Sequence, residues 1–303
     1  MRLFVFGFGY SARAVVRRLG PRLEKAWGTT RNSKGLEAIR ALGVNPILFE
    51  ARPSPLPVPP TQGGRESRVA AALAEATHVL VSIPPDAFGD PVLNTFRKEL
   101  IRTKPTSIAY LSTVGVYGDH NGAWVDETSE CRPVSVRSRQ RLAAEEEWRS
   151  FSAESAIPVA IIRLAGIYGP GRGPFEKIRQ GTARRIVKSG QVFNRIHVDD
   201  IAAIVEAAFD RRAEGVFNGV DDEPAPPEDV LSYAAELLRM PPPPETPFGG
   251  AELSPMARSF YGENKRVRND KIKPELGVRL AYPTYREGLR GVLEAESRSD
   301  RGR

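Results

Sequence analysis

The sequence has little cysteine and no long apolar run. Cys131 is its single cysteine, which excludes an intramolecular disulfide and fits a reducing compartment, so a cytoplasmic protein is expected. No apolar run approaches the ~20 residues that a membrane helix needs. The first apolar run ends at Gly7, where the core of a cleavable signal peptide would continue. We therefore expect neither a membrane partner nor a signal peptide.

A concentrated block of charge is also missing. The net charge of +7 comes from 44 Lys and Arg against 37 Asp and Glu, and the basic residues are scattered, without interleaved aromatic residues. Nucleic-acid binding, attraction of anionic cofactors or substrates, and the base composition of the genome all remain open as explanations. The scatter makes nucleic acid the weakest of the three. With 41% hydrophobic and 27% charged residues, the 303-residue chain is typical of one large α/β domain or of a domain with a smaller appendage.

The first residues carry a recognisable pattern. An apolar run over 3–6 predicts a buried parallel strand, and a helical pattern follows over 11–19. Between them, the spacing Gly7-x-Gly9-x-x-Ala12 matches the dinucleotide-binding fingerprint. Its three positions make the turn, let the backbone approach a pyrophosphate and pack the helix on the strand. Free N–H groups and the helix dipole would then face the phosphates. The predicted cofactor contacts here are Gly7, Phe8, Gly9, Tyr10, Ser11 and Ala12.

The end of the second predicted strand, 25–30, indicates which nucleotide binds. An NAD site would place Asp or Glu about 20 residues past the glycines, to bind the ribose hydroxyls. This chain has Arg31 there, with Ser33 and Lys34 close by. Their donors suit a 2′-phosphate, which favours NADP over NAD. The alternative is that Arg31 is simply a solvated turn residue.

Further strands and helices alternate along the first half of the chain. This alternation predicts a doubly wound parallel α/β sheet whose carboxyl strand ends line the cofactor crevice. Ile83 and Pro84 end the fourth strand and belong to that crevice, whereas His78 lies at its amino end and is expected to be structural. Residues 51–65, rich in proline, predict an irregular surface loop. The other predicted strands are 46–49 and 107–112, and the helices are 36–42, 66–76 and one capped by Asp90.

Five later segments resemble one family. They are Leu111-Ser-Thr-Val-Gly-Val-Tyr-Gly118, Asp126-Glu-Thr with Arg132-Pro133, and the stretches 162–171, 196–202 and 217–222. They are similar in type and order to motifs of the extended short-chain dehydrogenases/reductases, the NAD(P)-dependent epimerase/dehydratase family. The resemblance implies a Rossmann-type core over 1–168, completed by 196–220. It also implies a smaller substrate-binding lobe over 169–195 and 221–296, and a flexible tail at 297–303.

The catalytic signature of that family is missing. Members carry Tyr-x-x-x-Lys on the helix after the Val-Tyr-Gly loop, and alignment on 142–145 puts Arg137 and Arg141 at these positions. No tyrosine occurs from 118 to 167. A guanidinium stays protonated near neutral pH, so Arg137 cannot replace the tyrosine, whereas Arg141 keeps donors for the nicotinamide ribose. The chain therefore resembles an atypical member.

Other residues keep family positions near the reacting centre. Thr113 matches the catalytic Ser/Thr that hydrogen-bonds the substrate, although a β-branched residue ending a strand explains it equally well. Tyr117 is an alternative acid, with packing as the competing role. Ser112 is expected to shape the crevice, and Ala165 and Ile167 to surround the nicotinamide.

The predicted substrate contacts lie in the second lobe. Arg172 and Arg195 could face an anionic substrate, with a solvated basic face as the alternative. Asp199 and Asp200 precede a helical pattern and are expected to cap that helix. No metal site is expected, because no His or Glu cluster accompanies this pair.

Two classes of function remain open. The first is an NADP-dependent oxidoreductase or epimerase-like enzyme acting on a small polar, phosphorylated or nucleotide-linked substrate. The second is an NADP(H)-binding sensor or scaffold without turnover. Thr113 and a full substrate lobe favour the enzyme, whereas the missing tyrosine favours the sensor. The resemblance further implies a homodimer formed through the helices after the fourth and fifth strands.

Overall fold

The computed structural model describes residues 1–50 and 64–301 of the chain. Its centre is a seven-stranded parallel sheet in the order β11-β7-β5-β4-β1-β2-β3. The predicted doubly wound sheet is therefore confirmed. Its strands are β1 (Arg2–Phe6), β2 (Lys25–Thr30), β3 (Asn45–Leu48), β4 (His78–Val81), β5 (Ser107–Thr113), β7 (Val159–Leu164) and β11 (Gly215–Gly219).

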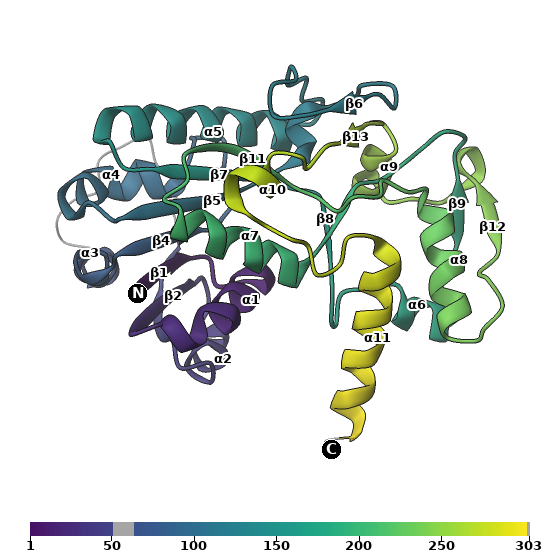
Figure 1. The fold of residues 1–303 in the computed structure, drawn as a ribbon, viewed down its shortest axis with the longest axis horizontal. Helices are drawn as coiled ribbons and strands as arrows, with labels where there is room; N and C mark the ends of the chain where they lie inside the picture. Colours follow the sequence, from purple (N-terminus) through teal and green to yellow (C-terminus); the bar gives the residue numbers. More distant parts are fainter. Residues whose placement is uncertain (51–63, 302–303) are drawn as a thin grey trace.

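Helices cover both faces of this sheet (Figure 1). Neighbouring residues of a strand point to opposite faces, so Ala109 and Leu111 of β5 face one core while Ile108 and Tyr110 face the other. Each face therefore buries its own apolar cluster. The first includes residues of α1 (Tyr10–Leu19), α2 (Lys34–Arg40), α7 (Val198–Asp210) and α10 (Ile272–Leu276), and the second residues of α3 (Gly64–Glu75), α4 (Pro91–Thr103) and α5 (Val136–Ser155).

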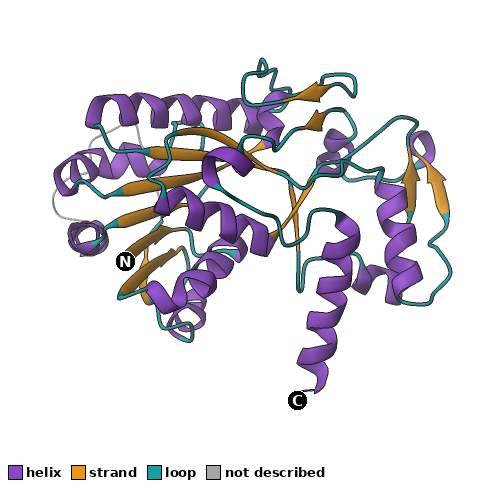
Figure 2. Cartoon of the chain, viewed as in Figure 1, coloured by secondary structure: helices purple, strands orange, loops and turns teal. Residues whose placement is uncertain are grey.

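The smaller lobe lies beyond the carboxyl ends of the central strands (Figures 1 and 2). It has its own apolar cluster, which includes Phe175, Ala234 and Leu289. Three two-stranded sheets supplement the main one. They pair β10 (Arg195–His197) with β8 (Gly166–Tyr168), β12 (Glu245–Pro247) with β9 (Arg185–Val187), and β13 (Arg266–Val267) with β6 (Trp124–Val125). The helices here are α6 (Phe175–Arg179), α8 (Pro227–Leu237), α9 (Pro255–Phe260) and α11 (Tyr285–Arg301). The 3-10 turns among the described residues are η1 (Gly20–Arg22), η3 (Val114–Tyr117) and η4 (Phe248–Gly250).

Several sequence predictions can be compared with these bounds. Asp90 caps α4 as expected, because its carboxylate accepts the N–H groups of Val92 and Leu93. The last helix reaches Arg301, so it continues into the tail expected from 297. The proline-rich loop expected at 51–65 lies outside the described residues, except for its last two positions, which begin α3.

Candidate functional site

The turn after β1 is pinned to both neighbouring strands. Gly7 has φ +85°, and a Cβ there would lie 2.6 Å from Cγ2 of Ile83, so only glycine fits. The Gly7 N–H donates to Oγ1 of Thr29 at 2.8 Å, and the Phe8 N–H donates to the Thr29 carbonyl at 2.9 Å. A Cβ on Gly28 would lie 2.5 Å from the Phe8 ring. The turn is therefore held in one conformation.

The backbone N–H groups available to a ligand begin at Tyr10, after the two glycines of the fingerprint. The amides of Gly7 and Phe8 are used internally, and that of Gly9 donates to the Gly7 carbonyl at 2.9 Å. Arg13 makes the first intrahelical bond of α1, to Gly9, which leaves the N–H groups of residues 10–12 for a ligand. A Cβ on Gly9 would meet nothing within 4 Å. The start of α1 therefore offers an open cradle that fits a pyrophosphate.

The residues predicted to select the nucleotide lie at the end of the next strand. Arg31, Ser33 and Lys34 are all exposed between β2 and α2. Ser33 precedes α2 without a capping side-chain hydrogen bond. No carboxylate occurs from 30 to 36, and Glu37 lies one turn into the helix. This arrangement leaves a hydroxyl and two cations accessible beside the cradle.

Arg172 lies beside the cofactor cradle. Its guanidinium carbon is 5.6 Å from the centroid of the Tyr10 ring, and the Tyr10 hydroxyl donates to the Pro170 carbonyl at 3.0 Å. Gly169, at φ +152°, permits this approach, because a Cβ there would lie 2.6 Å from the Tyr10 hydroxyl. Arg195 lies elsewhere in the lobe, half-buried on β10. The two predicted substrate arginines therefore contact different residues.

Arg195 is held by its own lobe. Its Nη1 donates to the carbonyls of Phe193 and Ala225, at 2.8 and 3.1 Å. Burial lowers the pKa of its guanidinium, opposed by the nearby carboxylate of Asp221. These internal bonds favour a structural role over the predicted substrate contact.

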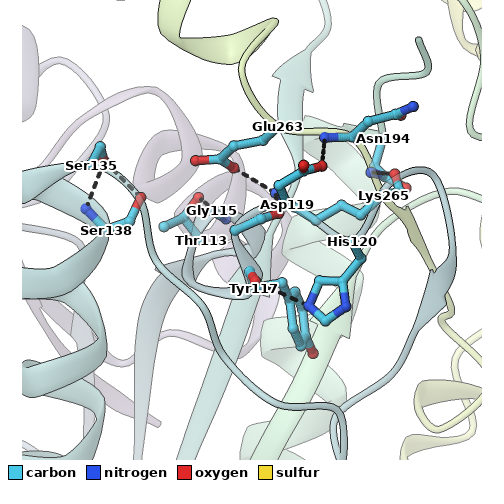
Figure 3. Close-up of polar contacts among 12 residues, drawn as sticks. Thr113, Gly115, Tyr117, Asp119, His120, Ser135, Ser138, Asn194, Glu263 and Lys265 are labelled. Atoms are coloured by element: carbon cyan, nitrogen blue, oxygen red, sulfur yellow. Dashed lines mark hydrogen bonds and ion pairs between the residues drawn. The ribbon is translucent and has the colours of Figure 1, made fainter. Parts of the chain in front are cut away.

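Thr113 ends β5 at the expected edge of the sheet. Its hydroxyl accepts the Gly115 N–H at 3.1 Å and so caps the turn η3. Ser138 contacts the same turn, since its Oγ lies 3.0 Å from the position that a Cβ on Gly115 would take. Ser135 caps α5 by accepting the Ser138 N–H at 3.0 Å (Figure 3). The hydroxyl groups of Thr113, Ser135 and Ser138 therefore gather around the turn η3.

The helix that carries the family's missing pair is α5. Arg137 is exposed, and its Nη1 lies 3.9 Å from the sulfur of Met256 in α9. Nη1 of Arg141 donates to the Tyr110 hydroxyl at 2.8 Å and to the Leu111 carbonyl at 3.0 Å. Arg141 therefore contacts β5 directly, and a role as ribose donor requires its other nitrogens.

Tyr117 is placed differently from the predicted acid. Its side chain is fully buried, its hydroxyl donates to Asn218 Oδ1 at 2.8 Å, and Arg163 lies over its ring. Burial raises its pKa to about 12. A buried phenol already engaged with a partner cannot reach a substrate, so the alternative packing role applies.

Ser112 also points away from the crevice. Its hydroxyl donates to Glu145, which forms a buried ion pair with Arg163 at 2.7 Å. The sequence did not predict this pair, in which each buried charge has the other as its partner. The expected role of Ser112 in shaping the crevice is therefore indirect, through the network beneath β5.

The other predicted residues lie at strand ends or in the core. Ile83 is half-buried and Pro84 exposed after β4, while Ala165 is buried and Ile167 half-buried after β7. His78 begins β4 at the amino end, where its Nδ1 lies 2.9 Å from Oγ1 of Thr77.

The predicted capping of α7 by its aspartates is wrong. His197 caps this helix, because its Nδ1 accepts the Asp199 N–H at 3.2 Å. Asp200 instead accepts the N–H groups of Ala281 and Tyr282, at 2.7 and 3.1 Å. The Asp200 carboxylate thus binds the backbone of residues 281–282, and this contact between distant parts of the chain could not be read from the local sequence pattern. Among the described residues, no group of three His, Cys, Asp or Glu could hold a metal ion.

His197 makes the stability of the fold depend on pH. Burial lowers its pKa to about 4, against a reference of 6.5. The unfolded chain then binds more protons than the folded one between these values, so this residue's contribution to stability falls as the pH drops from 6.5 to 4.

We expect His197→Asn, which keeps a side chain suited to an N-cap, to lose less stability than the wild type over this pH range. Urea unfolding at pH 4.5 and 7 measures the difference. Asp200, whose pKa burial raises to about 6, has the opposite effect but is present in both proteins. Equal losses in the two proteins would contradict the assignment.

Together, the parallel sheet and the glycine turn after β1 define a Rossmann-type fold. Residues 91–219 match the model of the NAD dependent epimerase/dehydratase family. The matched part of the chain runs from α4 to β11. Among residues 1–50 and 64–301, none of the helices has both the length and the apolar character required to cross a membrane.

Three known proteins show how far the similarity extends. A conserved protein of unknown function from Silicibacter pomeroyi is 48% identical, with a TM-score of 0.85 over 97% of this chain and 98% of its own. A 3-diazoavenalumate denitrifying reductase from Streptomyces is 30% identical over 156 residues, which cover 47% of this chain and 50% of that protein. The chain thus matches half of that relative's length. A dTDP-glucose 4,6-dehydratase from Bacillus anthracis, in complex with NAD, shares the fold at 15% identity, with a TM-score of 0.77 over 99% of this chain and 98% of its own.

Proposed function

We propose that this protein is an NADP-dependent oxidoreductase or epimerase-like enzyme acting on a small polar substrate. The open cradle at Gly9, with Arg31 exposed beside it, carries this proposal. The bound nicotinamide would supply hydride transfer. The chain's own part is to hold the phosphates on α1 and to polarise a substrate carbonyl with Thr113.

We also propose a homodimer formed through α4 and α5. Light scattering, which measures the molar mass in solution, tests it.

The related reductase supports the first class of function. The name of the Streptomyces protein describes a reductase, and its match covers half of each chain. A binding protein without turnover is the second candidate, and one observation favours it. Helix α5 carries no tyrosine, and the buried Tyr117 cannot replace one.

The cofactor preference can be tested directly. We expect NADPH to bind at least tenfold more tightly than NADH, because Arg31, Ser33 and Lys34 offer donors to a 2′-phosphate. In Arg31→Ala, NADPH affinity should fall toward that of NADH, while NADH affinity stays constant. Isothermal titration calorimetry with both nucleotides measures this. Arg40→Ala is the matched control, because Arg40 is an exposed arginine at the far end of α2. Equal affinities in the wild type would contradict the NADP assignment.

A further inference from the structure

A pocket of about 480 Å³ lies outside the predicted site. It forms where three segments far apart in the sequence meet, namely 119–122, 188–190 and 262–266. The first of these segments directly follows Gly118, which ends the turn η3. Because Thr113 caps the other end of that turn, the pocket and the proposed reacting centre are joined by a single turn of chain.

Asn264, which belongs to the third segment, fixes the pocket by bonding to the other two. Its main-chain N–H donates to Oδ1 of Asp119 at 2.8 Å, and its carbonyl accepts the N–H groups of His120 and Gly122 at 3.0 and 2.9 Å. Its side-chain Nδ2 donates to the Gly190 carbonyl at 2.9 Å. The walls are therefore held by hydrogen bonds within the chain, and a ligand would enter a formed site.

Two cations, Lys188 and Arg266, line this pocket, and neither forms an ion pair within 4 Å among the described residues, although the charge of Lys188 helps to lower the pKa of the Asp119 carboxyl. The ammonium of Lys188, half-buried, donates to Gln191 Oε1 at 3.1 Å and to the Tyr261 carbonyl. Nη1 of Arg266 donates to the Gly122 carbonyl. An ammonium has three donors and a guanidinium five, so both groups keep donors for a ligand.

The charge balance of the pocket favours an anion. Among its described lining residues, Asp119 carries the one carboxylate, against the two cations Lys188 and Arg266. The neighbouring Lys265 differs, because Glu263 neutralises it at 2.6 Å while it donates to the Gly118 carbonyl at 2.7 Å (Figure 3). A net positive charge therefore remains, and a half-buried position strengthens its attraction for an anion.

We propose that Lys188 and Arg266 bind a carboxylate or phosphate group of the substrate, with its reacting end extending toward Thr113. This rests on the proposed function and names the substrate class as small anionic carbonyl compounds. Contact with the anionic substrate, which the sequence predicted for Arg172 and Arg195, is thereby assigned to Lys188 and Arg266. Carboxylate and phosphate share the same charge-assisted recognition, and the experiment separates them.

The test titrates inorganic phosphate and, separately, malonate into the full-length protein by calorimetry. Saturating NADPH occupies the cofactor's own phosphate sites, and sodium chloride keeps the ionic strength constant. We expect saturable binding of at least one probe, weakened at least tenfold in both Lys188→Met and Arg266→Met. Arg268→Met is the matched control and should bind as the wild type does, because Arg268 is exposed and lies over Trp124. Lys188→Gln, which keeps a hydrogen-bonding side chain, replaces Lys188→Met if that variant does not fold.

Failure of the wild type to bind either probe would overturn the proposal. Equal affinity in the wild type and both pocket variants would also overturn it. NADPH fluorescence measured on the same samples distinguishes failure of the anion site from failure of the proposed function. If NADPH binds and the anions do not, the anion site fails while the cofactor proposal stands, whereas absence of NADPH binding removes the proposed function itself.

Discussion

The variant Gly9→Val is expected to lose NADPH affinity at least a hundredfold while its folding changes little. At Gly9, φ is −91° and ψ −161°, an extended conformation that valine adopts, and its Cβ would enter open space. The side chain would then fill the cradle that a pyrophosphate needs, while the loss of glycine at an N-cap costs about 1 kcal/mol. Calorimetry with NADPH and thermal unfolding of the free protein measure the two effects.

The same substitution at Gly7 serves as the contrast. Gly7 has φ +85°, and its Cβ would collide with Ile83, so Gly7→Val should lose stability as well as binding. Strain in this backbone region costs about 1–3 kcal/mol before the collision is counted. If Gly9→Val bound NADPH as tightly as the wild type, the cradle would not be the pyrophosphate site.

The second large effect concerns the ion pair beneath β5. Glu145→Ala should destabilise the fold by roughly 3–5 kcal/mol, because it leaves the buried guanidinium of Arg163 uncompensated. The pair lies at 2.7 Å with both side chains almost fully buried, and it joins α5 to β7. Urea unfolding at neutral pH measures the change in the free energy of unfolding.

Glu154→Ala supplies the control for this prediction. Glu154 pairs with Arg97 at the surface, where such pairs contribute about 0–1 kcal/mol. The double replacement of Glu145 and Arg163 by methionine should recover most of the loss, since no charge then stays buried. A loss for Glu145→Ala no larger than that for Glu154→Ala would contradict the account.

Most of the sheet could be predicted because its signals are local. The strand 25–30 coincides with the observed β2, and the apolar residues of β5 alternate between two cores as a buried parallel strand requires. The glycine spacing likewise identified the turn. It did not show that Thr29 holds the turn, because that contact comes from the neighbouring strand, although a glycine inside a strand, Gly28, was a usable signal.

The site residues depended on contacts that a local pattern cannot contain. Tyr117 sits in a family motif, yet its hydroxyl bonds to Asn218, which lies 101 residues away along the chain. The pocket around Lys188 and Arg266 is built from three separate segments joined through Asn264. Scattered basic residues predicted an anionic ligand in general terms, but only the folded chain shows which of them share a pocket.

The central claim is that the start of α1 binds the pyrophosphate of a pyridine nucleotide, and thermal unfolding with and without NADPH tests it most directly. A ligand at a hundred times its Kd stabilises the folded state by about 2.7 kcal/mol, which the melting temperature reports as a rise of several degrees. We predict this rise with NADPH, a smaller one with NADH at equal concentration, and none in Gly9→Val. A wild-type melting temperature unchanged by either nucleotide would contradict the account.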